Sequence, residues 1–300
     1  MDKYKSGFVT IMGRANVGKS TLMNRFVGQK VSIVTHKPQT TRRKIQATFT
    51  GEDFQVIFID TPGFHEPKSK LGEYMIKSAE RSLSGVDVIL YLTDPYAKIN
   101  ADNAVILQKL ENVKIPVILV INKIDTIRKP EILPIIDAYS SRREFNEIIP
   151  ASALTGENAG VVFEAIKKYL PEGPMYFPAN TLTDQPERLI AAEIIREKAL
   201  ITLQDEVPHG IAVDVTSMKI RDGKDFFDIE AVLYCERESQ KGIVIGKNGM
   251  MLREIGRRAR PEIERLLDAR VHLSLWLKVK KDWRDNNVNM RRFGYDLGDI

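Results

Sequence analysis

Cysteine and histidine are scarce in this 300-residue chain. The single cysteine, Cys235, has no partner for an intramolecular disulfide, so we expect a reducing, cytosolic compartment. The histidines stand far apart and lack the spacing of metal ligands. They are His36, His65, His209 and His272. We therefore expect neither a disulfide scaffold nor a metal centre built from Cys and His.

Long apolar runs are also missing. No stretch approaches the ~20 apolar residues that a transmembrane helix requires. The charged N-terminus leads directly into an apolar run at Phe8, which is unlike a signal peptide. The chain is 43% hydrophobic and 28% charged, as is ordinary for a globular protein, and its length suggests about two domains.

The net charge of +5 is unevenly distributed. Residues 1–178 contain 24 Lys and Arg against 19 Asp and Glu, whereas residues 179–300 contain 21 of each kind. The basic total therefore does not by itself indicate nucleic-acid binding by the C-terminal half. Only local clusters of basic residues bear on that question.

A phosphate-binding signature lies near the N-terminus. Residues 13–20 read G-x-x-x-x-G-K-S between an apolar run, predicted to be a strand, and a segment predicted to be a helix. Gly13 and Gly18 allow consecutive N–H groups to point inward, and the helix N-terminus favours an anion. Lys19 would reach the β- and γ-phosphates, and the Ser20 hydroxyl would bind Mg²⁺. The pattern predicts a nucleoside triphosphate site.

Two further segments would complete a Mg²⁺ site. Residues 54–59 read as a buried strand that ends at Asp60, where a Mg²⁺-linked aspartate belongs. The D-T-P-G motif that starts there ends at Gly63, whose N–H would reach a γ-phosphate without steric cost. A polar loop earlier in the chain carries the adjacent hydroxyls of Thr40 and Thr41, which suggests a switch segment.

The N-K-I-D motif at Asn122–Asp125 predicts guanine recognition. The Asp125 carboxylate accepts two hydrogen bonds, which matches N1–H and N2–H₂ of guanine, whereas adenine offers no such pair. Asn122 would bond the base and tie its loop to the phosphate loop, and the Lys123 stem would lie along the ring. Main-chain N–H groups of residues 152–154 would face O6 of the base.

Taken in order, G-R-A-N-V-G-K-S, T-T-R, D-T-P-G, N-K-I-D and S-A-L resemble the five motifs of the translation-factor-like small GTPases. The T-T-R triplet and Asn16 are most similar to the Era family. The resemblance implies GTP hydrolysis to GDP and phosphate, and it points to Thr41 as the Mg²⁺-linked threonine, with Thr40 still open. The implied catalytic residues are Lys19, Thr41, Asp60 and Gly63, and the implied Mg²⁺ ligands are Ser20, Thr41 and Asp60. The implied nucleotide-binding residues are Gly13, Arg14, Ala15, Asn16, Val17, Gly18, Lys19, Ser20, Thr21, Asp60, Thr61, Pro62, Gly63, Asn122, Lys123, Asp125, Ser152, Ala153 and Leu154.

One position departs from the better-known GTPases. Phe64 follows the D-T-P-G motif, where those proteins carry a glutamine that orients the attacking water. An apolar side chain cannot orient water, so we expect slow intrinsic hydrolysis. Related proteins with an asparagine at the position of Asn16 can use K⁺ to complete the phosphate charge clamp, and for this chain K⁺ is a hypothesis.

The second half begins after a linker. Residues 171–186 contain four prolines, which is typical of a domain boundary. Helical spacing follows over residues 189–200. Alternating runs at residues 211–215 and 227–233 flank a turn at residues 221–224, which predicts a hairpin.

A G-x-x-G segment at Gly246–Gly249 lies between two helix-like segments. Apolar residues from Leu252 to Leu266 then fall on one helical face, and residues 271–279 read as a final strand. This order of elements resembles a type II KH domain. Two glycines around a polar pair allow a nucleic-acid backbone to approach closely, which is how this module clamps about four nucleotides.

Local charge agrees with RNA binding. Residues 247–270 carry seven basic residues against four acidic ones, and residues 278–292 carry six against two. The expected RNA-binding residues are Gly246, Lys247, Asn248, Gly249, Arg253 and Arg257.

The sequence thus predicts an α/β P-loop GTPase domain with a mostly parallel sheet, followed by an α+β type II KH domain. We place the GTPase domain at residues 1–173, a linker at 174–186, and the KH domain with a basic C-terminal tail at 187–300. The resemblance implies a GTP-binding switch that binds 16S rRNA near its 3′ end and assists assembly of the small (30S) ribosomal subunit and rRNA maturation. It also implies a cytoplasmic monomer with peripheral membrane contact, although the sequence shows no anchor.

Two rival functions stay open. The first is an RNA-binding scaffold whose nucleotide is structural and hardly turned over, which Phe64 favours; single-turnover hydrolysis with and without rRNA separates it from a switch. The second is an RNA-modifying enzyme gated by GTP. It would need a nucleophile or a cofactor pocket, and the sequence offers no histidine pair or second glycine-rich fingerprint for one.

Overall fold

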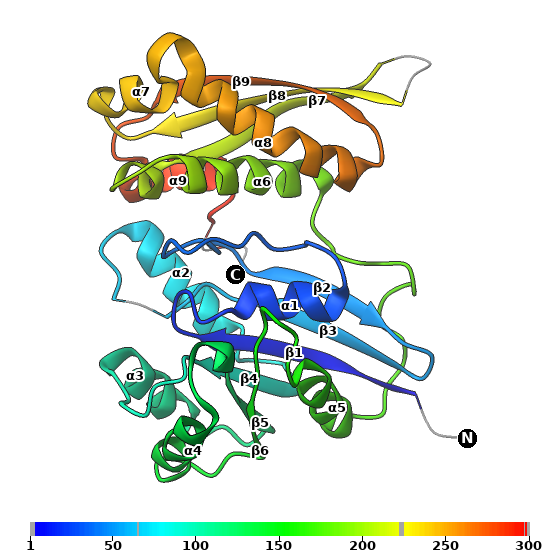
Figure 1. Cartoon of the computed structure of the whole chain (residues 1–300). Coiled ribbons are helices and arrows are strands. Elements are labelled where there is room, and N and C mark those ends of the chain that lie inside the picture. Colours follow the sequence, from blue (N-terminus) through cyan, green and yellow to red (C-terminus); the bar gives the residue numbers. More distant parts are fainter. Residues whose placement is uncertain (1–3, 65, 222–224, 297, 299–300) are drawn as a thin grey trace. The chain divides into compact units, whose positions relative to one another are not determined.

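The computed structural model describes residues 4–64, 66–221, 225–296 and 298. His65 and most of the predicted turn, residues 222–224, lie outside the described residues. The chain divides into two compact units (Figure 1). The first comprises the segments up to Val34, Thr41–Pro67 and Met75–Asp184. The second comprises Thr35–Thr40, Lys68–Tyr74 and the segment from Gln185 onward.

A six-stranded sheet with the order β2-β3-β1-β4-β5-β6 forms the centre of the first unit. The strands are β1 (Lys5–Gly13), β2 (Ile45–Thr50), β3 (Phe54–Asp60), β4 (Val88–Thr93), β5 (Val117–Ile121) and β6 (Glu147–Pro150). Every pair of neighbours is parallel except β2 and β3, which are antiparallel. The mostly parallel sheet is therefore confirmed.

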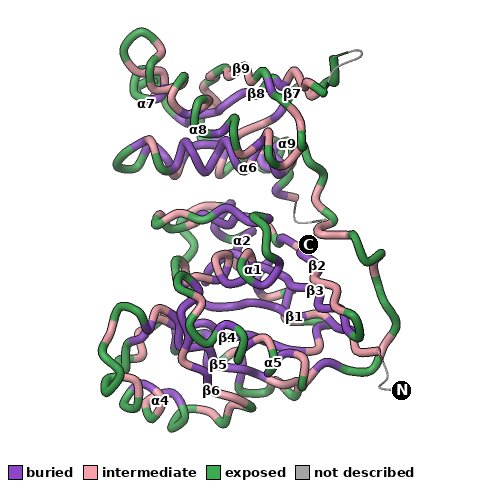
Figure 2. The backbone as a smooth tube through the Cα atoms, turned by 45° about the vertical axis from the view of Figure 1, so that its right-hand side comes forward, coloured by how far each residue is buried: buried purple, intermediate pink, exposed green. Residues whose placement is uncertain are grey.

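Helices cover both faces of this sheet. As a result, β3, β4 and β5 are buried at every position (Figure 2). Residues of α1 and α5 share one apolar cluster with the strands, and residues of α3 and α4 share the other. The helices are α1 (Lys19–Val27), α2 (Lys70–Arg81), α3 (Ala101–Leu110), α4 (Ile132–Ser140) and α5 (Ala159–Tyr169). Two short 3₁₀ turns, Ile124–Thr126 and Lys129–Glu131, precede α4.

The carboxyl ends of the central strands meet at one edge of the sheet. There β1 leads into the phosphate loop, β3 into D-T-P-G, β4 into Asp94 and β5 into N-K-I-D. Ligands of open α/β sheets bind at this edge. Motifs that are far apart in the sequence are therefore neighbours in space.

The second unit contains a three-stranded sheet with the order β7-β8-β9. Its strands are β7 (Ala212–Ile220), β8 (Phe226–Cys235) and β9 (Arg270–Val279). The β7–β8 pair is antiparallel and the β8–β9 pair is parallel. The helices are α6 (Glu187–Thr202), α7 (Glu238–Ile245), α8 (Met250–Leu267) and α9 (Asn287–Arg292). Short 3₁₀ turns cover Val207–Gly210, Lys247–Gly249 and Trp283–Asp285.

The order of elements confirms the predicted helix–strand–strand–helix–loop–helix–strand pattern. Ile255, Ala259 and Ile263 of α8 are buried in one cluster with Cys235 of β8, so the lone cysteine is a core residue. The predicted basic tail is more structured than we expected. It contains α9, and the indole of Trp283 is buried and donates to the carbonyl of Gly210 at 2.8 Å.

Within the described residues, no helix is both long enough and apolar enough to cross a membrane.

Candidate nucleotide-binding site and RNA-binding groove

The phosphate loop requires glycine at both ends. A Cβ on Gly13 (φ 152°) would lie 2.3 Å from the carbonyl oxygen of Leu92. A Cβ on Gly18 (φ 99°) would lie 2.2 Å from Nδ2 of Asn122. Neither position admits a side chain without moving its neighbour, so the loop is held in a conformation that only glycine adopts without strain.

Lys19 is buried at the start of α1, and its ammonium donates to the carbonyls of Gly13 at 3.2 Å and Arg14 at 2.8 Å. Burial lowers the pKa of the Lys19 ammonium to about 8, although the Asp60 and Asp94 carboxylates raise it. The cation is therefore held across the loop that would surround the phosphates.

Hydroxyls gather around Asp60, as a Mg²⁺ site requires. Ser20 donates to Oδ2 of Asp60 at 2.6 Å, and its hydroxyl lies 2.9 Å from that of Thr41. Ser32, which sequence reasoning missed, donates to the same carboxylate oxygen at 2.9 Å. Within the described part of the chain, the buried Oδ1 of Asp60 has no hydrogen-bond partner. A carboxylate oxygen without a partner beside two hydroxyls fits a hard cation such as Mg²⁺.

The hydroxyls of Thr40 and Thr41 make different contacts. The Thr40 hydroxyl donates to the carbonyl of Lys37 at 2.6 Å and lies 2.7 Å from the hydroxyl of Thr35. Thr41 alone of the pair lies beside Ser20. This geometry favours Thr41 as the Mg²⁺-linked threonine.

Burial raises the pKa of the Asp60 carboxyl above its usual range, and the nearby Lys19 ammonium opposes that rise. A bound divalent cation would favour the ionised carboxylate further. Among the described residues, no group of three or more His, Cys, Asp and Glu side chains is placed to hold a metal. The group around Asp60 differs from such a cluster, because it combines one carboxylate with hydroxyls.

The end of the D-T-P-G motif packs directly against the phosphate loop. A Cβ on Gly63 would lie 2.5 Å from the main-chain nitrogen of Ala15, so only glycine permits this approach. The next residue, Phe64, is buried in the apolar cluster that includes α3 and α4. Phe64 is therefore a core residue, in keeping with the expectation that it does not orient water.

Asn122 is buried and links three segments of the site. Its Nδ2 donates to the carbonyl of Val17 at 2.6 Å, and its Oδ1 accepts from the main-chain nitrogen of Ala153 at 2.8 Å. The predicted tie to the phosphate loop is thus present. Ser152 donates to Oδ1 of Asp125, and Asp125 is exposed.

Two residues of α1 that carry no motif hold neighbouring loops. Arg25 donates to the carbonyls of Ala153 and Leu154, both at 2.7 Å. Oδ1 of Asn24 accepts from the main-chain nitrogens of Val31 and Ser32, both at 2.9 Å. The helix that follows the phosphate loop therefore positions the S-A-L loop and the segment that carries Ser32.

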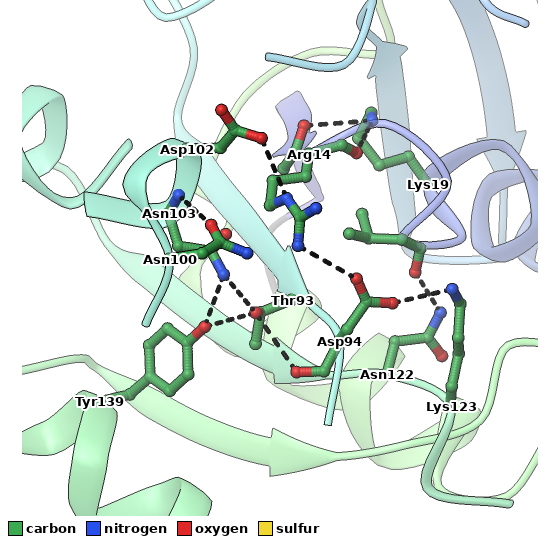
Figure 3. A network of polar contacts seen from close by, with 12 residues as sticks. Arg14, Lys19, Thr93, Asp94, Asn100, Asp102, Asn103, Asn122, Lys123 and Tyr139 are labelled. Atoms are coloured by element: carbon green, nitrogen blue, oxygen red, sulfur yellow. Dashed lines mark hydrogen bonds and ion pairs between the residues drawn. The ribbon is translucent and has the colours of Figure 1, made fainter. Parts of the chain in front are cut away.

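Figure 3 shows a further polar network beneath the phosphate loop, which joins Arg14, Asp94 and Lys123. Asp94 was not among the predicted site residues, because a single aspartate after a strand has no distinguishing pattern.

The G-x-x-G loop has backbone angles that suit its glycines. Gly246, Asn248 and Gly249 have φ values of 71°, 53° and 75°. A Cβ on Gly246 would lie 2.7 Å from that of Met251, whereas Lys247 and Asn248 are exposed. The loop thus presents two polar side chains and a tightly turned main chain to the solvent.

A groove of about 740 Å³ begins at this loop and runs between α8 and β9. It is lined by Gly249, Met250, Leu252, Arg253, Glu254, Gly256, Arg257, Arg260, Leu273 and Leu275. Arg253 donates to the carbonyl of Asn248, and Arg257 pairs with Glu254 at 2.7 Å. Hydrogen bonds from Arg257 and Arg258 lower the pKa of Glu254 to about 2. The groove therefore combines an apolar floor with a mostly basic rim.

The predicted basic segment 278–292 is less available than its composition suggests. Arg284 pairs with Glu236, Arg291 with Asp296, and Arg292 with Asp214. These pairs offset much of the charge that would otherwise attract RNA.

The fold and the site together define a P-loop GTPase joined to a KH module. A family model described as a 50S ribosome-binding GTPase matches residues 8–123, and a KH domain model matches residues 206–284. GTPase Era of Clostridioides difficile (strain 630) is 51% identical over 98% of this chain and 99% of that protein. GTPase Era of Alkaliphilus oremlandii (strain OhILAs) is also 51% identical, over 98% and 99% of the two chains. The chain belongs to the GTPase Era family, and it is a GTPase.

Solved structures of Era proteins agree with this family assignment. A crystal structure of Era with MgGDPNP and nucleotides 1506–1542 of 16S ribosomal RNA matches with a TM-score of 0.95 and 44% identity, covering 98% of this chain and 100% of that one. A tyrosine-to-alanine variant of Aquifex aeolicus Era bound to GDP and AlF₄⁻ matches with a TM-score of 0.94 and 43% identity, over 98% and 100%.

Proposed function

We propose that this GTPase is a nucleotide-controlled RNA-binding protein that assists assembly of the small ribosomal subunit. It binds GTP or GDP with Mg²⁺, hydrolyses GTP slowly, and binds 16S rRNA near its 3′ end. The observation that carries the proposal is that one chain combines a glycine-dependent phosphate loop with a mostly basic groove that starts at a G-x-x-G loop. The related Era structure that contains both MgGDPNP and 16S rRNA nucleotides supports the pairing of ligands.

In this proposal the phosphate-loop N–H groups, the α1 N-terminus and Lys19 hold the phosphates. Ser20 and Thr41 bind Mg²⁺ through their hydroxyls, and Asp60 supplies the carboxylate. Mg²⁺, when bound, neutralises charge that develops on the phosphates. The Gly63 main chain, already against the phosphate loop, donates to the γ-phosphate. The remaining predicted nucleotide contacts keep the roles given above.

Slow hydrolysis follows from Phe64. Its ring is buried in the core, so the attacking water depends on main-chain groups or on other residues for its orientation. The electrostatic contribution of Lys19 and Mg²⁺ is then the main source of rate enhancement. The K⁺ hypothesis for Asn16 extends this idea, and equal hydrolysis rates in K⁺ and Na⁺ would refute it.

The switch proposal draws on the composition of the second unit. That unit includes residues 35–40, which immediately precede Thr41, and residues 68–74, which follow the D-T-P-G motif closely. Within it, Lys37 donates to the carbonyl of Leu203 at 2.6 Å, and the buried Arg196 donates to the carbonyl of Thr40. Loss of the γ-phosphate would release Thr41 and thereby change these contacts, which would alter RNA binding.

RNA binding is assigned to the Gly246–Gly249 loop, with Arg253 and Arg257 on the rim of the groove. The two glycines admit a phosphate backbone, and Lys247 contributes positive charge at the loop tip. A monomeric state and peripheral membrane contact stay predictions.

A matched pair of variants tests the GTPase half of the proposal. Thr41→Val removes the hydroxyl beside Ser20, so single-turnover GTP hydrolysis with Mg²⁺ should fall by about 100-fold. Thr40→Val, the control, should retain hydrolysis within about threefold. Equal losses would contradict the assignment of Thr41. The scaffold alternative would gain support if 16S rRNA failed to change hydrolysis by the unaltered protein.

A further inference from the structure

Asp94 lies between the phosphate loop and the N-K-I-D motif. It directly follows β4, and its side chain is only 15% exposed. Its Oδ1 lies 2.8 Å from the ammonium of Lys123, and its Oδ2 lies 3.8 Å from Nη1 of Arg14 (Figure 3). One carboxylate thus contacts a cation of the N-K-I-D loop and a cation of the phosphate loop.

We propose that Asp94 is a positioning residue for guanine nucleotide binding, which fixes Lys123 and Arg14 before the nucleotide arrives. The inference rests on the proposed nucleotide contacts, because Lys123 and Arg14 act there on base and phosphates. It adds a residue that touches neither ligand and acts through these two side chains.

The main chain around Asp94 is itself fixed. The Thr93 carbonyl accepts from the main-chain nitrogen of Asn122 at 2.8 Å. The Thr93 hydroxyl lies 2.6 Å from that of Tyr139, and Nδ2 of Asn103 donates to both, at 3.3 and 2.9 Å. These contacts are buried, so the Asp94 carboxylate starts from a rigid position.

Arg14 has a second acidic partner that anchors it to α3. Its Nε donates to Oδ2 of Asp102 at 3.2 Å, in the first turn of that helix. The helix start is capped, because the Asn100 side chain accepts from the main-chain nitrogen of Asn103 at 3.0 Å. The guanidinium therefore connects the phosphate loop to two acidic groups.

Lys123 needs such support. Its φ of 65° is left-handed, a conformation that costs free energy for a lysine. A free lysine side chain also loses rotamer freedom when a ligand orders it. An ion pair that forms before binding lowers that ordering cost and slows nucleotide release.

Asp94→Asn tests the proposal in the full-length protein. The substitution keeps the shape of the side chain and removes its charge, so the affinity for fluorescent GDP should fall about tenfold, mainly through faster release. Asp137→Asn is the matched control, because it makes the same change at an exposed position of α4, away from the Asp94 ion pairs; its effect should stay within about threefold.

A double-mutant cycle with Lys123→Gln separates positioning from general stability. If Asp94 acts through Lys123, the double variant should bind GDP no more weakly than the worse single variant. Fully additive losses, or an unchanged affinity for Asp94→Asn, would overturn the proposal. If Asp94→Asn does not fold, the comparison passes to the isosteric pair Asp94→Glu and Asp94→Gln, of which only the charged variant should bind well.

The same titrations keep this proposal distinct from the assignment of the guanine site. Asp94→Asn should weaken GDP while the preference for GDP over ADP persists, because Asp125 is intact. A wild-type protein that fails to distinguish GDP from ADP would instead contradict the proposed guanine site.

Discussion

The proposed nucleotide site and the proposed RNA groove are built in opposite ways. In the first, Lys19, Asp60 and Asn122 are buried, and each is held by hydrogen bonds to main chain or hydroxyls. In the second, Lys247 and Asn248 are exposed on a loop. Buried polar atoms demand one geometry and thus give selectivity, whereas exposed cations act over a distance and are screened by salt. The difference predicts that small changes of shape break the first site and that changes of charge break the second.

The largest effect should come from Gly18→Ala. The new Cβ would lie 2.2 Å from Nδ2 of the buried Asn122, so GDP and GTP affinity should fall at least about 100-fold in a fluorescence titration. Gly160→Ala on α5 is the control, because a Cβ there meets nothing within 4 Å. Near-normal affinity of Gly18→Ala would show that the loop is not as constrained as the structure indicates.

Asp125→Asn tests selectivity rather than shape. The amide no longer accepts two hydrogen bonds from guanine, so preference should shift from guanosine to xanthosine nucleotides, with about a 100-fold loss for GTP. Competition assays with GTP, XTP and ATP provide the measurement, and Asp137→Asn, exposed on α4, serves as the control. Retained GTP preference in the Asp125 variant would refute the base-reading role.

The contrast between the two regions also explains what could be predicted from the sequence. The phosphate loop, D-T-P-G and N-K-I-D follow parallel strands, so their meeting at one sheet edge is predictable from topology. The choice between Thr40 and Thr41 is not predictable from the sequence, because adjacent hydroxyls differ only in where the folded loop directs them.

Positions without a motif were missed altogether. Ser32, Arg25 and Asp94 act through contacts to segments distant in the sequence, and no local pattern marks them. Composition predicts only the positive charge of the C-terminal tail, because α9 is too short to show a helical period. Its arginine pairs with Glu236, Asp296 and Asp214 likewise depend on tertiary structure.

Charge reversal in the RNA groove should have a smaller effect. Lys247→Asp should weaken binding of a 16S rRNA 3′-end oligonucleotide about tenfold and reduce the salt slope by about one, while GDP affinity is unchanged. Lys219→Asp is the control, since it makes the same charge change at an exposed position of β7. Equal losses for both variants would mean that only net charge matters.

The smallest effect concerns pH. The Lys19 ammonium has a pKa of about 8 in the nucleotide-free protein, and bound phosphates would raise it. At a pH above 8, binding is therefore coupled to the uptake of a proton by Lys19. GDP affinity should fall as the pH rises from 8 to 9, by up to about fivefold. Guanosine, which lacks phosphates, should show a smaller decrease, because only the ionisation of its N1–H then weakens binding. A GDP affinity independent of pH would contradict this account of Lys19.

The central claim is that the nucleotide state controls RNA binding, and one comparison tests it most directly. The affinity for the 16S rRNA 3′-end oligonucleotide is measured with a non-hydrolysable GTP analogue and with GDP, at one salt concentration. A coupled switch predicts affinities that differ by about tenfold or more. Equal affinities in both states, and in the protein without nucleotide, would contradict the claim.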